Sequence, residues 1–130
     1  MTQTKTLFQK IIDREIPAEI IYEDEKYIAV LDIFPKSKGH TLLITKEPFR
    51  WTYDVPYFGE YFEKAKEIGL HLKEKLGATY ISFQSWGVDI PHAHIHIVPL
   101  YSMTEKYERS TYTDQELREL GEKLRIVSSK

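Results

Sequence analysis

The chain has 130 residues, no cysteine and a formal net charge of −2 at pH 7, and 42% of its residues are hydrophobic. This length predicts one domain over residues 1–130, and the lack of cysteine excludes disulfides, a thiol nucleophile and a cysteine-ligated zinc site. The near-neutral charge argues against binding to duplex nucleic acid. No apolar run is long enough for a membrane span or a signal peptide, so we expect no membrane partner and a cytoplasmic protein.

The N-terminal part of the chain predicts a short helix followed by three strands. Thr6 and Gln9 form a candidate capping box before an apolar helical stripe, and Pro17 is expected to end this helix. Residues 19–35, EIIYEDEKYIAVLDIFP, are rich in β-branched and aromatic residues and break at the polar EDEK, which is typical of two strands joined by a tight turn. A third strand is predicted over residues 40–46.

The middle of the chain predicts one long helix and two more strands. Apolar residues recur at helical spacing from Phe58 to Leu76, and Gly77 supplies a residue suited to the helix C-cap. Alternating β-type stretches over residues 79–85 and 92–100 predict the fourth and fifth strands.

The C-terminal part of the chain predicts a final helix, which completes the fold class. Thr113 with Glu116 forms a second candidate capping box, opening a helical segment over about residues 113–127. Three successive strands with short links favour an antiparallel sheet. The sequence therefore predicts an α+β domain with helices packed on the sheet, its core within about residues 7–100.

The stretch PHAHIHIVPL, residues 91–100, places three histidines at every second position. Side chains alternate faces along a strand, so His92, His94 and His96 share one face, roughly 6.5–7 Å apart, opposite an apolar face. A lone histidine would most simply be a surface residue. Three on one face, opposite a wholly apolar one, favour a functional site.

Two chemistries would use such a row. Neutral imidazole is a common metal ligand, and His40 or Asp89 could complete a metal site. Alternatively, an imidazole nitrogen could attack phosphorus while its neighbours bind the phosphoryl oxygens. The spacing of the histidines alone does not separate these alternatives.

Two segments of the chain resemble a known family. HAHIHIV matches the His-x-His-x-His-x-x signature of the histidine triad (HIT) family, and FQKIIDREIPAEIIYEDEKYIAVLDIFPKSKGH resembles the N-terminal half of its Hint branch, the nucleoside phosphoramidases. The resemblance covers nearly all of residues 7–100. It implies a five-stranded antiparallel sheet with two main helices, and a homodimer in which the two sheets join.

The resemblance also implies roles for the histidines. His94 would be the nucleophile that attacks the α-phosphorus of a bound nucleotide, and its other ring nitrogen would donate to the backbone carbonyl of His92. His96 would bind the phosphoryl oxygens, while His92 and His40 would complete and orient the row. The resemblance implies no metal and no cofactor.

The nucleotide contacts follow from the same resemblance. Asp32 would accept hydrogen bonds from the ribose hydroxyls, although a turn carboxylate before Pro35 is the alternative. Ordinary core packing is the alternative for the residues of the base slot. The resemblance places that slot at four apolar residues: Ile16, Val30, Leu31 and Ile33.

The loop before the triad departs from the family pattern. QSWGVDIPH is shorter than the glycine-rich loop of many relatives, with Gln84 or Ser85 nearest an asparagine position and Val88 near a glutamine position. Asp89 falls near a position where relatives often have serine. The resemblance therefore assigns the nucleophile but does not fix the phosphate contacts or the leaving-group preference.

Together these features predict a hydrolase that cleaves purine nucleotide conjugates, such as AMP conjugates, through a nucleotidyl-His94 intermediate. Within the family, the alternative is a diadenosine polyphosphate hydrolase. Outside it, the alternatives are a metal-binding protein that uses the triad with His40 and a nucleotide-binding module without turnover.

Overall fold

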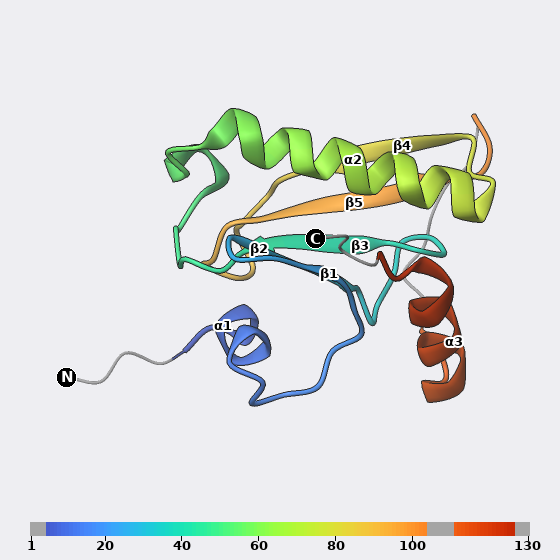
Figure 1. Cartoon of the computed structure of the whole chain (residues 1–130), viewed down its shortest axis with the longest axis horizontal. Coiled ribbons are helices and arrows are strands. Elements are labelled where there is room, and N and C mark those ends of the chain that lie inside the picture. Colours follow the sequence, from blue (N-terminus) through green and yellow to red (C-terminus); the bar gives the residue numbers. More distant parts are fainter. Residues whose placement is uncertain (1–4, 104–110, 127–130) are drawn as a thin grey trace.

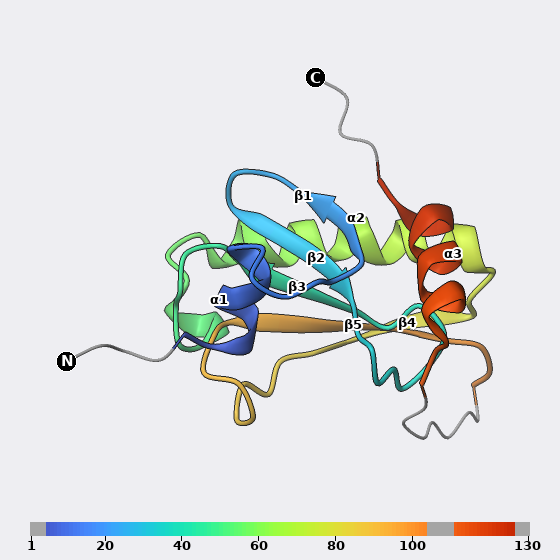
Figure 2. The same ribbon diagram turned by 90° about the horizontal axis from the view of Figure 1, so that it is seen from below.

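A computed structural model of the chain describes residues 5–103 and 111–126. The strands form one antiparallel sheet in the order β1-β2-β3-β5-β4, with helices on both of its faces (Figures 1 and 2). This confirms the predicted α+β fold. The elements in chain order are α1 (Leu7–Ile12), β1 (Ile20–Glu23), β2 (Tyr27–Leu31), β3 (Thr41–Thr45), a 3-10 turn (Thr52–Asp54), α2 (Phe58–Leu76), β4 (Tyr80–Gln84), β5 (His94–Leu100) and α3 (Asp114–Leu124).

The two faces of the sheet carry separate cores. On one face α2 and α3 pack against the strands, and Ala93, Ile95 and Ile97 belong to that core, as the alternation predicts. On the other face α1 covers a smaller apolar cluster that includes Phe8 and Ile11 (Figure 1). The histidine face of β5 therefore lies under a helix rather than in open solvent.

The position of β5 brings the histidines next to two other strands. In the β3–β5 pairing, His94 lies opposite Ile44 and His96 opposite Leu42. On the other side of β5, Gln84 of β4 lies opposite His96. His92, His94 and His96 are 0%, 1% and 6% exposed, so the row is buried and is not a run of surface histidines.

The end of α1 differs from the prediction. The helix ends at Ile12, before Pro17, because Arg14 adopts a left-handed conformation with φ 62°. The backbone N–H of Glu15 then donates to the carbonyl of Lys10, which closes a Schellman-type cap. Proline is therefore not the residue that ends this helix.

The two capping boxes have different outcomes. The Thr6 hydroxyl accepts from the backbone N–H of Gln9, but the Gln9 side chain donates to Asp13, so only half of the first box forms. Thr113 and Glu116 form both bonds of the second box.

The ends of two C-terminal elements also differ from the prediction. β5 begins at His94 instead of residue 92. Ahead of it, the N–H of Ala93 donates to the Phe49 carbonyl of the adjacent connection. α3 ends at Leu124, and the N–H of Ile126 donates to Ile21 of β1; Val127 lies outside the described residues. No helix in the described part of the chain has the length and apolar character to cross a membrane.

Candidate active site

His94 carries a buried ring nitrogen with no hydrogen-bond partner among the described residues. Its Nδ1–H donates to the backbone carbonyl of His92 over 2.7 Å, the bond expected from the resemblance. This bond fixes the proton on Nδ1 and leaves the lone pair on Nε2. A neutral imidazole held in this tautomer is a candidate nucleophile.

The surroundings of His94 favour its neutral form. Burial lowers the pKa of the ring because it disfavours the imidazolium. The His92 carbonyl and the carboxylates of Asp89 and Asp32 act in the opposite direction, while Arg50 adds to the lowering. The net direction is downward, so His94 is neutral at neutral pH.

His92, whose carbonyl accepts from His94, lies outside the cavity described below. Its Nε2–H donates to the carbonyl of Thr45 over 2.6 Å, and its Nδ1 accepts from the hydroxyl of Thr6 at 3.3 Å. Burial lowers the pKa of His92, and the neighbouring His94 adds to this effect. Both ring nitrogens of His92 therefore form hydrogen bonds that hold the backbone just before β5. The backbone carbonyl of His92 in turn holds His94.

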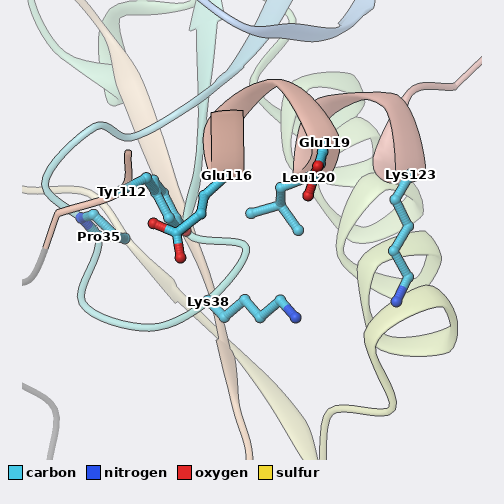
Figure 3. Close-up of a pocket in the computed structure, with 7 residues that line it drawn as sticks. All are labelled: Pro35, Lys38, Tyr112, Glu116, Glu119, Leu120 and Lys123. Atoms are coloured by element: carbon cyan, nitrogen blue, oxygen red, sulfur yellow. The ribbon is translucent and has the colours of Figure 1, made fainter. Parts of the chain in front are cut away.

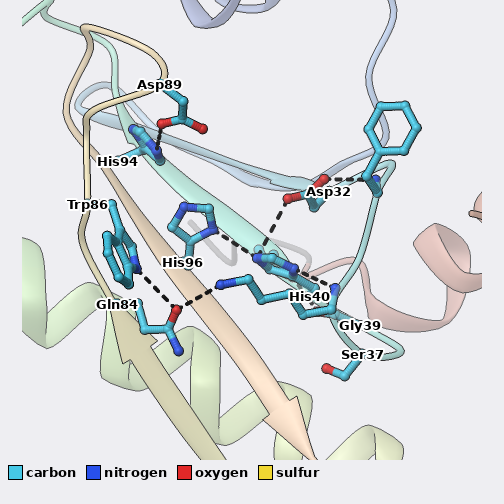
Figure 4. Close-up of polar contacts among 12 residues, drawn as sticks. Asp32, Ser37, Gly39, His40, Gln84, Trp86, Asp89, His94 and His96 are labelled. Atoms are coloured by element: carbon cyan, nitrogen blue, oxygen red, sulfur yellow. Dashed lines mark hydrogen bonds and ion pairs between the residues drawn. The ribbon is translucent and has the colours of Figure 1, made fainter. Parts of the chain in front are cut away.

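A second pair of histidines is linked ring to ring. The backbone N–H of Lys36 donates to Nδ1 of His40 over 3.0 Å, so the proton of neutral His40 lies on Nε2. That proton is donated to Nδ1 of His96 over 2.9 Å (Figure 4). His96 consequently carries its own proton on Nε2, which makes that nitrogen a donor.

Asp32 lies beside this pair, just after β2. Its Oδ1 accepts from the backbone N–H of Phe34 over 2.8 Å, and its Oδ2 lies 3.6 Å from Nε2 of His40. The backbone turn and the His40 ring thus hold the carboxylate at the edge of the histidine row (Figure 4).

The same three side chains are the best metal-binding candidates among the described residues. Ligand atoms of Asp32, His40 and His96 lie within 4.8 Å of one another. A metal on Nε2 of His40 would require that nitrogen to lose its proton, which would have to move to Nδ1. Nδ1 already accepts the N–H of Lys36, so the donor set does not fit a metal as it stands.

A cavity of about 210 Å³ opens in front of His94 and His96. Phe8 of α1 forms one wall and packs edge-on against the His94 ring at 4.7 Å. Ile33 is 53% exposed, so core packing does not explain it, whereas Val30 belongs to the core and also lines the cavity. The predicted residues that line this cavity are His94, His96, Asp32, Asp89, Ile16, Val30, Leu31 and Ile33.

Gln84 and Ser85 are not among the described residues that line the cavity. The side-chain carbonyl of Gln84 accepts from Nζ of Lys36 over 3.0 Å and from the Trp86 indole over 3.3 Å (Figure 4). Ser85 shares a hydrogen bond of 2.9 Å with Thr52. Both side chains thus fix the base of the loop.

Some contacts were not identified from the sequence. Phe8 lies in the apolar helical stripe that follows Thr6, and nothing in that pattern indicated that its aromatic ring walls the site. The N–H of Lys36 sets the tautomers of two histidines, but a backbone group carries no sequence signal. Arg50, whose positive charge contributes to lowering the pKa of His94, lies in no motif that the sequence analysis could recognise.

A larger hollow of about 500 Å³ lies between the loop after β2 and α3 (Figure 3). Its charged side chains, such as Lys38 and Lys123, lie at the surface, and no histidine of the row reaches it. The smaller cavity is lined by His94 and His96, so it is the candidate active site.

The HIT domain family model matches residues 13–103 of this chain. The chain belongs to the HIT family. A HIT-like protein of 13.1 kDa from Mesomycoplasma hyorhinis is 40% identical over 105 residues, covering 73% of this chain and 92% of the relative.

Solved structures of HIT proteins share the fold. One from Bartonella henselae, described as a HIT-like protein involved in cell-cycle regulation, has TM-score 0.85 and 27% identity over 95% of this chain and 96% of that chain. A hypothetical histidine triad nucleotide-binding protein from Sulfolobus tokodaii has TM-score 0.80 and 28% identity, covering 90% and 87%. A HIT family hydrolase from Clostridium thermocellum has TM-score 0.66 and 29% identity, covering 81% and 98%.

Proposed function

We propose that this HIT protein is a nucleotide-binding hydrolase that cleaves purine nucleotide conjugates, such as AMP conjugates, at the α-phosphate through His94. The observation that carries the proposal is the buried Nε2 of His94, which has no hydrogen-bond partner among the described residues and faces a largely apolar cavity. The description of the Sulfolobus tokodaii structure as nucleotide-binding and of the Clostridium thermocellum structure as a hydrolase supports both parts.

The nucleotide is held by the two sides of the cavity. The base lies in the apolar slot that contains Ile16, Val30, Leu31 and Ile33. Asp32 accepts hydrogen bonds from the ribose hydroxyls, and Nε2–H of His96 donates to a non-bridging phosphoryl oxygen.

In the first step the lone pair of His94 Nε2 forms a bond to phosphorus while the bond to the leaving group breaks. The leaving group keeps the electron pair of that bond and, as an amine, takes a proton from water. The positive charge on the imidazole is stabilised by the bond from Nδ1–H to the His92 carbonyl. Water then attacks the nucleotidyl-His94, loses a proton to solvent and releases the nucleoside monophosphate.

Phosphoramidates are the proposed substrates of this site, with dinucleoside polyphosphates as the alternative. The His40–His96 arrangement argues against a resident metal, because Lys36 keeps the proton of His40 on the nitrogen that a metal would need.

The proposal includes a homodimer joined through the sheet. β4 forms one edge of the sheet, and two of its aromatic side chains, Tyr80 and Phe83, are 37% and 42% exposed. An edge strand of this kind can pair with the same strand of a second copy. Light scattering on the purified protein tests this: a monomer at micromolar concentration would contradict it.

Replacement of the nucleophile tests the proposed activity. His94→Asn should lower turnover of an adenosine phosphoramidate by several orders of magnitude while AMP affinity changes little, because the cavity survives. His71→Asn is the matched control, since His71 lies on α2 and contacts Leu124 away from the site. Near wild-type turnover by His94→Asn would refute the mechanism.

A further inference from the structure

Asp89 lies closer to the nucleophilic nitrogen than any other carboxylate in the described part of the chain. Its Oδ1 is 3.9 Å from Nε2 of His94, and the side chain is 60% exposed at the mouth of the cavity (Figure 4). The same oxygen accepts from the N–H of Ile90 over 2.9 Å, which fixes the carboxylate in this orientation. A negative charge is therefore held beside Nε2 of His94.

The charges around the cavity are unbalanced. Asp32 and Asp89 line it, but no lysine or arginine does so among the described residues. Arg50 acts on His94 from outside this lining: its guanidinium stacks on Trp51 at 3.7 Å and donates to the Gly87 carbonyl.

Lys36 is the second basic side chain near the row. Its Nζ donates to the side chain of Gln84 over 3.0 Å, and Figure 4 shows Gln84 at the opposite end of the histidine row from Asp89. A polyphosphate leaving group at the His94 end would thus meet a carboxylate where phosphate binding usually needs lysine or arginine.

We propose that Asp89 is a specificity-determining residue that selects leaving groups carrying a positive charge and disfavours leaving groups carrying a negative charge. The inference rests on the proposed function, because it assumes attack by His94. In an in-line displacement the leaving group departs from the side of phosphorus opposite Nε2, and a charge at the end of a short arm of that group comes within the field of Asp89, which lies exposed beside Nε2. The carboxylate attracts an ammonium group there and repels a carboxylate or phosphate.

A matched series of substrates isolates this effect. Three adenosine 5′-phosphoramidates share the same P–N bond and differ only in the end of the amine: propane-1,3-diamine is cationic, butylamine is neutral and 3-aminopropanoate is anionic. Values of kcat/KM are measured for the full-length protein and for Asp89→Asn, which keeps an oxygen to accept from the N–H of Ile90.

The wild-type protein should prefer the cationic, then the neutral, then the anionic substrate. For an exposed charge, the ratio of cationic to anionic kcat/KM should fall roughly tenfold in Asp89→Asn. Asp89→Lys should reverse the order. Glu63→Gln removes the same charge from the exposed face of α2, on the other side of the sheet, and should leave the ratio unchanged.

The outcomes separate the two proposals. If the wild-type protein hydrolyses none of the three substrates, the proposed function fails. If it hydrolyses them but Asp89→Asn and Asp89→Lys change all three rates by the same factor, the selection by Asp89 is refuted while the proposed function stands.

Discussion

The two ends of the histidine row differ in what holds each ring. At one end, His92 and His94 bond to backbone carbonyls, so His94 keeps its proton on Nδ1 and presents a lone pair. At the other end, the N–H of Lys36 and the ring-to-ring bond leave His96 with its proton on Nε2. The same residue type thus presents a lone pair or an N–H to the cavity, depending on which backbone group it meets.

Among the variants that leave His94 in place, removing the hydrogen-bond donor of His96 should have the largest effect on turnover. His96→Asn takes away a hydrogen bond to charge that develops on the phosphoryl oxygens, and loss of one such donor typically costs about 10²–10³-fold in kcat. This hydrogen bond is stronger in the transition state than to bound AMP, so AMP affinity should change less than kcat. Steady-state kinetics on an adenosine phosphoramidate, with His71→Asn as control, measure this. A kcat within about twofold of wild type would show that the two ends do not have separate roles.

The Asp32→Ala variant tests whether this carboxylate, which lies beside His40, binds the ligand or only orients His40. Asp32→Ala should weaken binding of AMP about tenfold to a hundredfold, because a charge-assisted hydrogen bond is worth roughly 1.5–3 kcal/mol. The 2′,3′-dideoxy analogue has no ribose hydroxyls at these positions and should be affected far less. Calorimetry with both ligands decides: equal losses would assign Asp32 to positioning His40.

The pH dependence examines the His94 end of the row. Protonation of Nε2 removes the attacking lone pair, so kcat/KM should fall as pH decreases through the pKa of His94. Burial lowers that pKa, so the acid limb should lie below the ordinary value of about 6.5 for histidine and the plateau should include neutral pH. The measurement uses a substrate whose leaving group does not titrate in this range.

Chelation distinguishes this account from a metal site. EDTA should leave the plateau unchanged, because no step uses a metal. Activity that collapses after exhaustive chelation and returns only with a specific ion, such as Zn²⁺, would favour metal-activated water instead.

Local sequence patterns predicted the features that depend on local geometry. The alternation of β5 gave both faces of the strand, and the spacing of Thr113 and Glu116 gave the cap of α3. The end of α1 was missed because Arg14 adopts a left-handed conformation that is uncommon for arginine, while its side chain pairs with Glu23 of β1 at 2.5 Å. The expectation that Pro17 ends the helix rests on the local sequence alone and takes no account of the Arg14 backbone conformation or of a contact with β1.

The site was predictable to the extent that side-chain identity defines it. The histidines and Asp32 carry their chemistry in the sequence, and they lie together. The tautomers were not predictable, because they depend on the backbone N–H of Lys36 and the carbonyls of Thr45 and His92. These groups exist in every residue and acquire a role only through the fold.

Direct observation of the covalent intermediate is the sharpest test of the account. A single-turnover reaction with an adenosine phosphoramidate is quenched on the millisecond scale under alkaline conditions that preserve phosphohistidine, and intact mass spectrometry with peptide mapping follows. The account predicts a transient rise by one adenylyl group, located on His94 and missing in His94→Asn. Full turnover by the wild-type protein without any adduct, or with an adduct on His96, would contradict the assignment of His94 as the nucleophile.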